Sequence, residues 1–384
     1  MTEGLDRQSF LRRSFAIGAA LTVPGIAAEL ARAGLAVPRG VDPNRLKKTL
    51  VFSNWPLYID VDKRKRHPSL DLFTKQYGVK VKYIEDINDN AQFFGKIQAQ
   101  LRRGQGIGRD IIVMTDNSQF PALLVKHKWV EKLDKSVLPN IKNLQPALQH
   151  PSWDPNRDYS LPWQSGMTGI GFNDKLTKPI TTIDQLLTDR KLKGKVTLLS
   201  NMGDTLPLVV LANGDNPEKI DDAAFNRALT KLQKAVKSGQ IRQFTGNDYA
   251  PLMAKGDVWA ATVWSGDMVQ LNADNAHLKF VIPKSGGAIW TDNMLIPTGG
   301  DAYTASVYMN FYFQPKIAAI VEDAISYVCP VQGAAQALLK KNPAAARNTL
   351  IFPTKRMLSQ LHIIDPNALV NPDYQRKWQK LLGA

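Results

Sequence analysis

The sequence is poor in the residues that build metal and redox centres. Among 384 residues it has one cysteine, Cys329, and five histidines, at positions 67, 127, 150, 277 and 362. A single cysteine excludes an internal disulfide, a zinc site built on cysteines and an iron–sulfur cluster held by this chain alone. The scattered histidines form no paired motif such as H-E-x-x-H. We therefore expect no bound metal and no redox cofactor.

The short signatures of common enzyme classes are also missing. The sequence has no G-x-S-x-G nucleophile elbow, and the glycines at 104, 106 and 108 lack the spacing and the preceding strand of a nucleotide-binding loop. The net charge is +15, but the basic runs at 63–66 and 190–195 contain no aromatic residues, unlike typical nucleic-acid-binding patches. We expect neither an enzyme nor a nucleic-acid-binding protein, with the basic side chains facing outward.

The first 36 residues have the features of an export signal. Arg12 and Arg13 precede an uncharged apolar stretch, 14–28, that is too short to span a bilayer comfortably. The arginine pair followed by Phe15 resembles a twin-arginine signal, and small residues up to Ala36 suit cleavage. No later segment has 18 consecutive apolar residues. The sequence predicts a protein that is exported to the periplasm or the cell surface and is soluble once 1–36 are removed.

The remaining chain alternates strand and helix patterns, which predicts an α/β fold with mostly parallel sheets. Strand-like runs occupy 49–55, 79–84, 110–115, 195–200, 258–264 and 277–283. Amphipathic helical patterns cover 89–103 and 221–238, and each stops at a glycine. The polar stretch 154–162 divides the strands into two sets, which indicates two lobes. Ligands of such folds bind at the carboxyl ends of strands, here 54–58, 115–118, 201–205 and 264–267.

Aromatic and acidic residues gather at these predicted strand ends. Trp55 follows the first strand, Trp264 and Asp267 follow a later one, and Trp290 and Asp292 come shortly afterwards. Aromatic faces attract cations, and a carboxylate accepts a charge-assisted hydrogen bond from an ammonium group. For any one of these residues a place in the core or a helix cap is an equal alternative. Their combination favours a site for an amine.

Five motifs in fixed order carry a resemblance to a known family. They are V-F-S-N-W-P-L-Y at 51–58, D-I-I-V-M-T at 110–115, D-Y-S-L-P-W at 158–163, W-S-G-D at 264–267 and P-K-S-G-G-A-I-W-T-D at 283–292. With them the chain resembles the periplasmic spermidine/putrescine-binding proteins, the solute receptors of polyamine ABC importers. The resemblance implies a type II periplasmic-binding-protein fold, with the ligand between two lobes. We expect lobe 1 to comprise 46–165 with 293–345, and lobe 2 to comprise 166–292 with 346–384.

The resemblance also implies a set of ligand-binding residues. It assigns aromatic walls and stacking rings, a small hydroxyl group after the third strand, and two carboxylates for the amine. Spermidine-type members have acidic residues where this chain has Met202 and Thr205, and Asp204 is close enough to replace one of them. The residues expected to bind the ligand are Trp55, Tyr58, Thr115, Asp204, Trp264, Asp267, Trp290, Asp292 and Tyr327.

One departure from the family pattern bears on the ligand. Pro56 and Leu57 stand where polyamine binders have a hydroxyl or acidic residue, so one ammonium partner is missing. Burying an ammonium without a carboxylate is costly, which favours a putrescine-like ligand over spermidine. We expect a monomer that delivers this amine to the permease subunits of an ABC transporter. The alternatives are the same fold with another small solute, such as an amino-acid-like amine, an opine or a sugar, and a secreted hydrolase that uses two carboxylates.

Overall fold

The computed structural model describes residues 40–87 and 90–383, so the export signal predicted at 1–36 lies outside the described residues. The strands are β1 (Thr49–Asn54), β2 (Lys80–Glu85), β3 (Ile111–Thr115), β4 (Ser160–Asn173), β5 (Val196–Leu199), β6 (Ile241–Thr245), β7 (Ala260–Trp264), β8 (Leu278–Val281), β9 (Gly287–Leu295) and β10 (Leu361–His362). The helices are α3 (Pro68–Tyr77), α4 (Asn90–Arg102), α5 (Phe120–Lys126), α6 (Ile183–Thr188), α7 (Met202–Ala212), α8 (Asp222–Lys237), α9 (Tyr249–Lys255), α10 (Ser265–Asp274), α11 (Ala302–Tyr312), α12 (Pro315–Ile325), α13 (Ala334–Leu338), α14 (Pro343–Arg347), α15 (Lys355–Leu358), α16 (Pro366–Val370) and α17 (Pro372–Leu382). Within the described ranges, no helix combines the length and the apolar character needed to cross a membrane.

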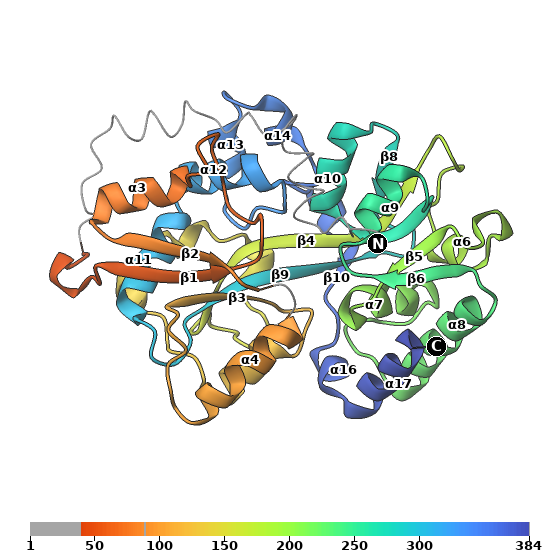
Figure 1. Ribbon diagram of the computed structural model, residues 1–384, viewed down its shortest axis with the longest axis horizontal. Helices are drawn as coiled ribbons and strands as arrows, with labels where there is room; N and C mark the ends of the chain where they lie inside the picture. Colours follow the sequence, from red (N-terminus) through yellow and green to blue (C-terminus); the bar gives the residue numbers. More distant parts are fainter. Residues whose placement is uncertain (1–39, 88–89, 384) are drawn as a thin grey trace, which may run out of the picture.

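The strands join into one sheet that extends through both halves of the molecule. Their order is β2-β1-β3-β9-β4-β7-β5-β6, with β8 beside β4 and β10 beside β9. Strands β1, β2 and β3 pair in parallel at one end, and β5, β6 and β7 pair in parallel at the other. The long antiparallel strands β4 and β9 cross the middle and connect the two halves (Figure 1). The predicted α/β class is confirmed.

Each half has its own hydrophobic core. The larger cluster on the side of β1–β3 includes the fully buried Phe52 and Phe73, with α3, α11 and α12 packed around it. On the side of β5–β7, Phe225 of α8 stacks on Tyr374 of α17 at a centroid distance of 3.8 Å. We call these halves lobe 1 and lobe 2. As their limits we propose the boundaries expected from the sequence, 46–165 with 293–345 and 166–292 with 346–384.

The local patterns in the sequence predicted the short strands and the amphipathic helices correctly. All six predicted strands are present, each within two residues of the predicted ends. The helix predicted over 221–238 is α8, which begins where the Asp221 carboxylate accepts the N–H of Ala224 and ends before Gly239 at φ +70°. The other predicted helix is α4; its proposed first residue, at 89, lies outside the described residues.

The two central strands were missed, and the expectation of a mostly parallel sheet was incomplete. The stretch 154–162, predicted to separate the lobes, runs into β4 at Ser160. All residues of β4 are buried, so it shows no alternation of polar and apolar side chains, and its glycines and Pro162 lower its apparent strand propensity. Pro162 is tolerated because the pairing with β9 shifts register between Pro162 and Gln164.

We predict that Gly166→Ala lowers the free energy of unfolding by about 1 to 3 kcal/mol. Gly166 of β4 faces Trp290 of β9, and an alanine Cβ would lie 2.2 Å from Cζ2 of that rigid indole ring. Urea denaturation measures the change. Gly95→Ala in α4 is the control, because its Cβ meets nothing within 4 Å and alanine favours a helix. Wild-type stability for Gly166→Ala would contradict this packing.

Candidate functional site

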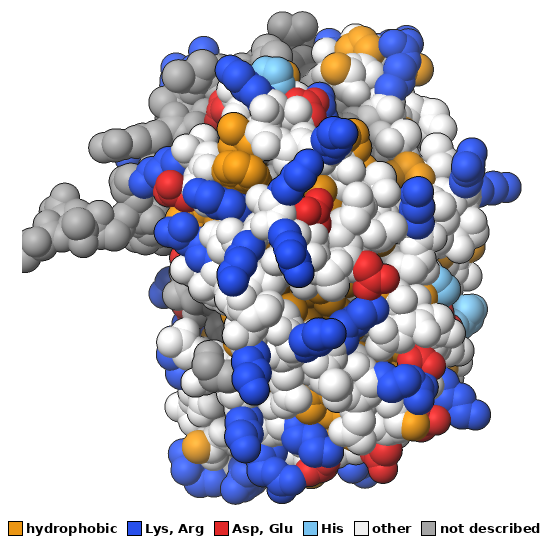
Figure 2. Space-filling view, turned by 90° about the vertical axis from the view of Figure 1, so that its right-hand side faces the viewer, with side chains coloured by type: hydrophobic (Ala, Val, Ile, Leu, Met, Phe, Trp, Pro, Cys, Tyr) orange, Lys and Arg blue, Asp and Glu red, His pale blue; other side chains and the backbone are white. Residues whose placement is uncertain are grey.

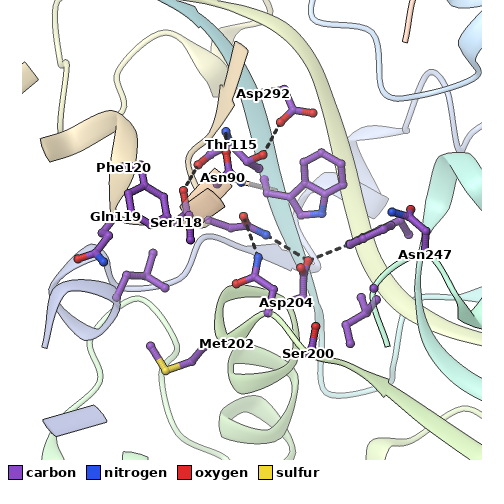
Figure 3. Close-up of a pocket in the computed structure, with 18 of the residues that line it drawn as sticks. Asn90, Thr115, Ser118, Gln119, Phe120, Ser200, Met202, Asp204, Asn247 and Asp292 are labelled. Atoms are coloured by element: carbon purple, nitrogen blue, oxygen red, sulfur yellow. Dashed lines mark hydrogen bonds between the residues drawn. The ribbon is translucent and has the colours of Figure 1, made fainter. Parts of the chain in front are cut away.

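A cavity of about 360 Å³ lies where the carboxyl ends of the strands from both lobes meet. All four strand ends singled out in the sequence contribute residues to its wall. Asp204 and Asp292 lie at different points of this wall, with Ser118, Gln119 and Phe120 on one side and Asn247 on the other (Figure 3). The cavity brings together eight of the predicted site residues: Trp55, Tyr58, Thr115, Asp204, Trp264, Trp290, Asp292 and Tyr327.

Asp292 is the carboxylate next to lobe 1, at the boundary between the proposed lobes on the connecting strand β9. It lies on β9 directly opposite Thr115 of β3, and it is 4% exposed. Thr115 Oγ1 donates to its Oδ1 at 2.6 Å, and the Tyr58 hydroxyl donates to its Oδ2 at 2.7 Å. Burial raises the pKa of Asp292 to about 7, and these two donors only partly oppose that rise. The carboxylate is therefore held in place by hydroxyl groups, with no cationic partner among them.

Asp204 is the carboxylate on the side of lobe 2. It lies in the first turn of α7, where the helix dipole favours negative charge, and it is 1% exposed. Thr168 Oγ1 and Trp264 Nε1 donate to its Oδ1 at 2.7 and 3.0 Å, whereas Oδ2 has no hydrogen-bond partner among the described residues. Burial raises the pKa of Asp204 to about 6. A buried carboxylate oxygen without a partner is costly, and a ligand donor would satisfy it.

An aromatic wall connects the two carboxylates; we use this name for Tyr58, Tyr327, Trp290 and Trp264. Their rings meet edge-on or tilted, with centroid distances of 5.1 Å for Tyr58–Tyr327, 6.0 Å for Trp290–Tyr327 and 6.5 Å for Trp264–Trp290. The Trp290 indole donates to Thr168 Oγ1 at 3.0 Å, so its orientation is fixed. Such a wall offers both apolar contact to methylene groups and π faces to a cation.

Asp267 is the one predicted site residue that the structure does not bring to the cavity wall. It lies in the first turn of α10, is 5% exposed, and accepts hydrogen bonds from the hydroxyls of Tyr327 and Tyr249 at 2.8 Å each. Tyr327 belongs to the aromatic wall, and the Tyr249 ring lies 6.0 Å from that of Trp264. In this arrangement Asp267 stands behind the wall and orients it.

The charge of the cavity is opposite in sign to the charge of the surface. Within 40–87 and 90–383, no lysine, arginine or histidine lines the cavity. Lys and Arg side chains are instead spread over the outer face of lobe 2 (Figure 2). Lys193, Lys234 and Lys237 of this lobe are exposed. Charges across solvent are screened within about 8 to 10 Å, so the local field is set by the nearby carboxylates, Asp204 and Asp292 on the wall and Asp116, whose charge acts on Asp292.

Leu57, which stands at the departure from the family pattern, does not line the cavity. Its backbone has φ +59°, and its N–H donates to Glu85 Oε1 at 3.0 Å. Neighbouring Pro56 lines the cavity and contributes no polar side chain. One oxygen of the Glu85 carboxylate thus accepts a hydrogen bond from the backbone of this turn.

Several residues of the site were not predicted from the sequence. Asn117 and Asn247 line the cavity, and Asn247 Oδ1 has no hydrogen-bond partner within the part of the chain that is described. Thr168 donates to the cavity carboxylate Asp204, and Tyr249 donates to Asp267 behind the aromatic wall. Asn117 lies inside the strand end 115–118 and could have been found there. Thr168 could not, because the strand that carries it, β4, has no recognisable strand pattern.

Comparison with known proteins agrees with this architecture. Residues 69–348 match the family described as bacterial extracellular solute-binding protein. A spermidine/putrescine-binding periplasmic protein of Salmonella typhimurium is 26% identical over 334 residues, which cover 85% of this chain and 91% of that protein. A putrescine-binding periplasmic protein of Pseudomonas aeruginosa is 28% identical over 355 residues, covering 87% and 92%.

Solved structures show the same fold. The spermidine/putrescine ABC transporter substrate-binding protein of Streptococcus pneumoniae superposes with a TM-score of 0.73 at 22% identity, over 87% of this chain and 97% of that one. The two-lobed periplasmic-binding-protein fold expected from the sequence is therefore confirmed, and so is the resemblance that suggested it. The chain belongs to the bacterial extracellular solute-binding proteins.

Proposed function

We propose that this protein captures a diamine of the putrescine type between its two lobes, with one ammonium group at Asp292 and the other at Asp204. The observation that carries the proposal is a pair of buried carboxylates in a cavity whose described lining has no basic side chain. One oxygen of Asp204 has no hydrogen-bond partner within that same part of the chain. Relatives named for binding putrescine and spermidine support this ligand class.

The two carboxylates support a dication better than a single charge. Burial is the main cause that raises the pKa of Asp292, and the negative charges of Asp116 and Asp204 add to it, so an ionised Asp204 opposes the ionisation of Asp292. A diamine would supply one positive charge for each, and its methylene chain would lie along the aromatic wall between them. A third ammonium would need another carboxylate, and neither Pro56 nor Leu57 provides one. We therefore propose a preference for putrescine over spermidine.

The remaining expectations from the sequence are part of the same proposal. We propose that the protein is exported, acts outside the cytoplasm as a monomer, and delivers its ligand to the permease subunits of an ABC transporter. The family and the periplasmic relatives support this assignment. Residues from both lobes line the cavity, so the ligand would favour the closed arrangement and the permease would recognise that form.

We predict that Asp292→Asn weakens putrescine binding by about 2 to 5 kcal/mol, because it leaves a buried ammonium without its carboxylate. Isothermal calorimetry against putrescine, spermidine, 4-aminobutyrate and a neutral sugar measures the change. Asp267→Asn is a matched control: it makes the same chemical change behind the aromatic wall, and we expect a much smaller loss. Unchanged diamine affinity in Asp292→Asn, or a sugar as the preferred ligand, would refute the amine site.

We predict that putrescine affinity rises with pH between about 5 and 8. In the empty cavity the pKa values of Asp204 and Asp292 are about 6 and about 7, so at low pH both must release a proton before they can hold an ammonium group. The amines themselves stay protonated, because their pKa values are near 10. At pH values below its pKa, each carboxyl group lowers the putrescine affinity by up to about tenfold for every pH unit.

Calorimetry in two buffers of different ionisation enthalpy counts the protons released on binding. We expect release at pH 6 to 7 and almost none at pH 8.5. In Asp292→Asn, the proton release that the parent shows near pH 7 should be absent. An affinity independent of pH, with no proton release, would point to a neutral solute.

A further inference from the structure

Lobe 1 and lobe 2 touch beside the cavity, where the loop after β3 meets the start of α7. Asn117 Nδ2 donates to Asp204 Oδ1 at 3.1 Å, and Asn201 Nδ2 donates to Asn117 Oδ1 at 3.3 Å. The backbone carbonyl of Asn117 lies directly over Gly203, where a Cβ would be 2.0 Å from its oxygen. The backbones of the two lobes therefore approach as closely as their atoms allow.

Asn117 differs from the other donors to Asp204 in the lobe it comes from. Thr168 and Trp264 are paired residues on β4 and β7, and β7 pairs with β5, the strand that leads into α7. These two donors thus belong to the same body as Asp204. Asn117 follows β3, which pairs with β1 in lobe 1. Its hydrogen bond to Asp204 therefore joins residues of the two lobes and requires these lobes to be in contact.

We propose that Asn117 is a positioning residue that lobe 1 supplies to Asp204 on closure, and that Gly203 is required for this approach. With Asn117 in place, Asp204 Oδ1 accepts three hydrogen bonds, and Oδ2 is left for the ligand. The role of Asp204 towards the ligand rests on the proposed function, whereas the contact between the lobes does not.

This contact couples closure to the charge of Asp204. The Asn117 hydrogen bond is one of the influences that lower the pKa of Asp204 against the rise caused by burial. Closure therefore favours the ionised carboxylate, and the ionised carboxylate favours a cationic ligand. By linkage, the ligand favours closure to the same extent. A contact that served only for packing would affect closure without affecting the pH dependence of binding.

The steric part is tested with Gly203→Ala. Gly246→Ala is the matched control: Gly246 also lines the cavity in lobe 2, but its Cβ would meet nothing within 4 Å. Spin labels at Lys96→Cys in α4 and Lys380→Cys in α17, both exposed positions, report the distance between the lobes, and the buried Cys329 should not react. We expect a short-distance population in the parent and in Gly246→Ala, with and without putrescine.

In Gly203→Ala we expect this population to be lost and putrescine affinity to fall at least tenfold. Closure like that of the parent, with undiminished affinity, would overturn the steric role of Gly203. If the parent binds no putrescine but Gly203→Ala still removes the short distance from the ligand-free protein, the proposed function fails and the closing contact is supported.

The positioning role is tested with Asn117→Ala. Loss of one hydrogen bond predicts about five- to tenfold weaker putrescine binding. Because the lost donor lowers the pKa of Asp204, the pH midpoint of binding should move upward, so the loss should be greater at pH 6 than at pH 8. If putrescine affinity fell equally at both pH values, Asn117 would serve only as a packing contact, and its positioning role would be overturned. Thermal unfolding of the same variant verifies that the fold is intact.

Discussion

The burial of two carboxylates in one cavity is the constraint on which the rest of the site depends. A carboxylate out of water must be hydrogen-bonded, paired with a cation or protonated. Asp292 is held by two hydroxyl groups, and Asp204 by donors that meet at one of its oxygens. None of these donors is positively charged, so the negative charge stays available. These donors thus keep the carboxylates in position without neutralising them, which is what the proposed binding of a cation requires.

Strands β4 and β9 determine where the groups around the two carboxylates lie. Asp292 and Trp290 lie on β9, and Thr168, which links Trp290 to Asp204, lies on β4. Because the two strands pair along most of their length, Trp290, Asp292 and Thr168 share one frame at the junction of the lobes, and Thr168 reaches Asp204 of α7 from it. Gly166 leaves room for the indole ring against β4. The strands that connect the lobes are thus also the ones that position several of the residues proposed to contact the ligand.

The elements that could be predicted from the sequence are those with a local signature. The short strands and α8 follow from hydrophobic periodicity and capping residues, and the strand ends pointed to part of the cavity wall. Strand β4 could not be predicted, because a strand buried on both faces has no alternating pattern. The placement of Asp267 behind the wall depends on the hydroxyls of Tyr249 and Tyr327, which no spacing in the sequence reveals. The resemblance supplied the fold correctly, but it could not show which carboxylates reach the cavity.

Under the proposed function, the raised pKa values explain how a basic protein holds a cationic ligand in an enclosed space. With pKa values of about 6 and about 7, the empty cavity holds protons on both carboxyl groups below about pH 6 and so avoids two unpaired buried charges there. A bound diamine replaces those protons with two ammonium groups, and the cavity again has little net charge. The basic surface does not oppose this exchange, because solvent screens it from the interior. Closure is therefore compatible with both the protonated empty cavity and the cavity that holds a diamine. The ligand only has to compete with protons.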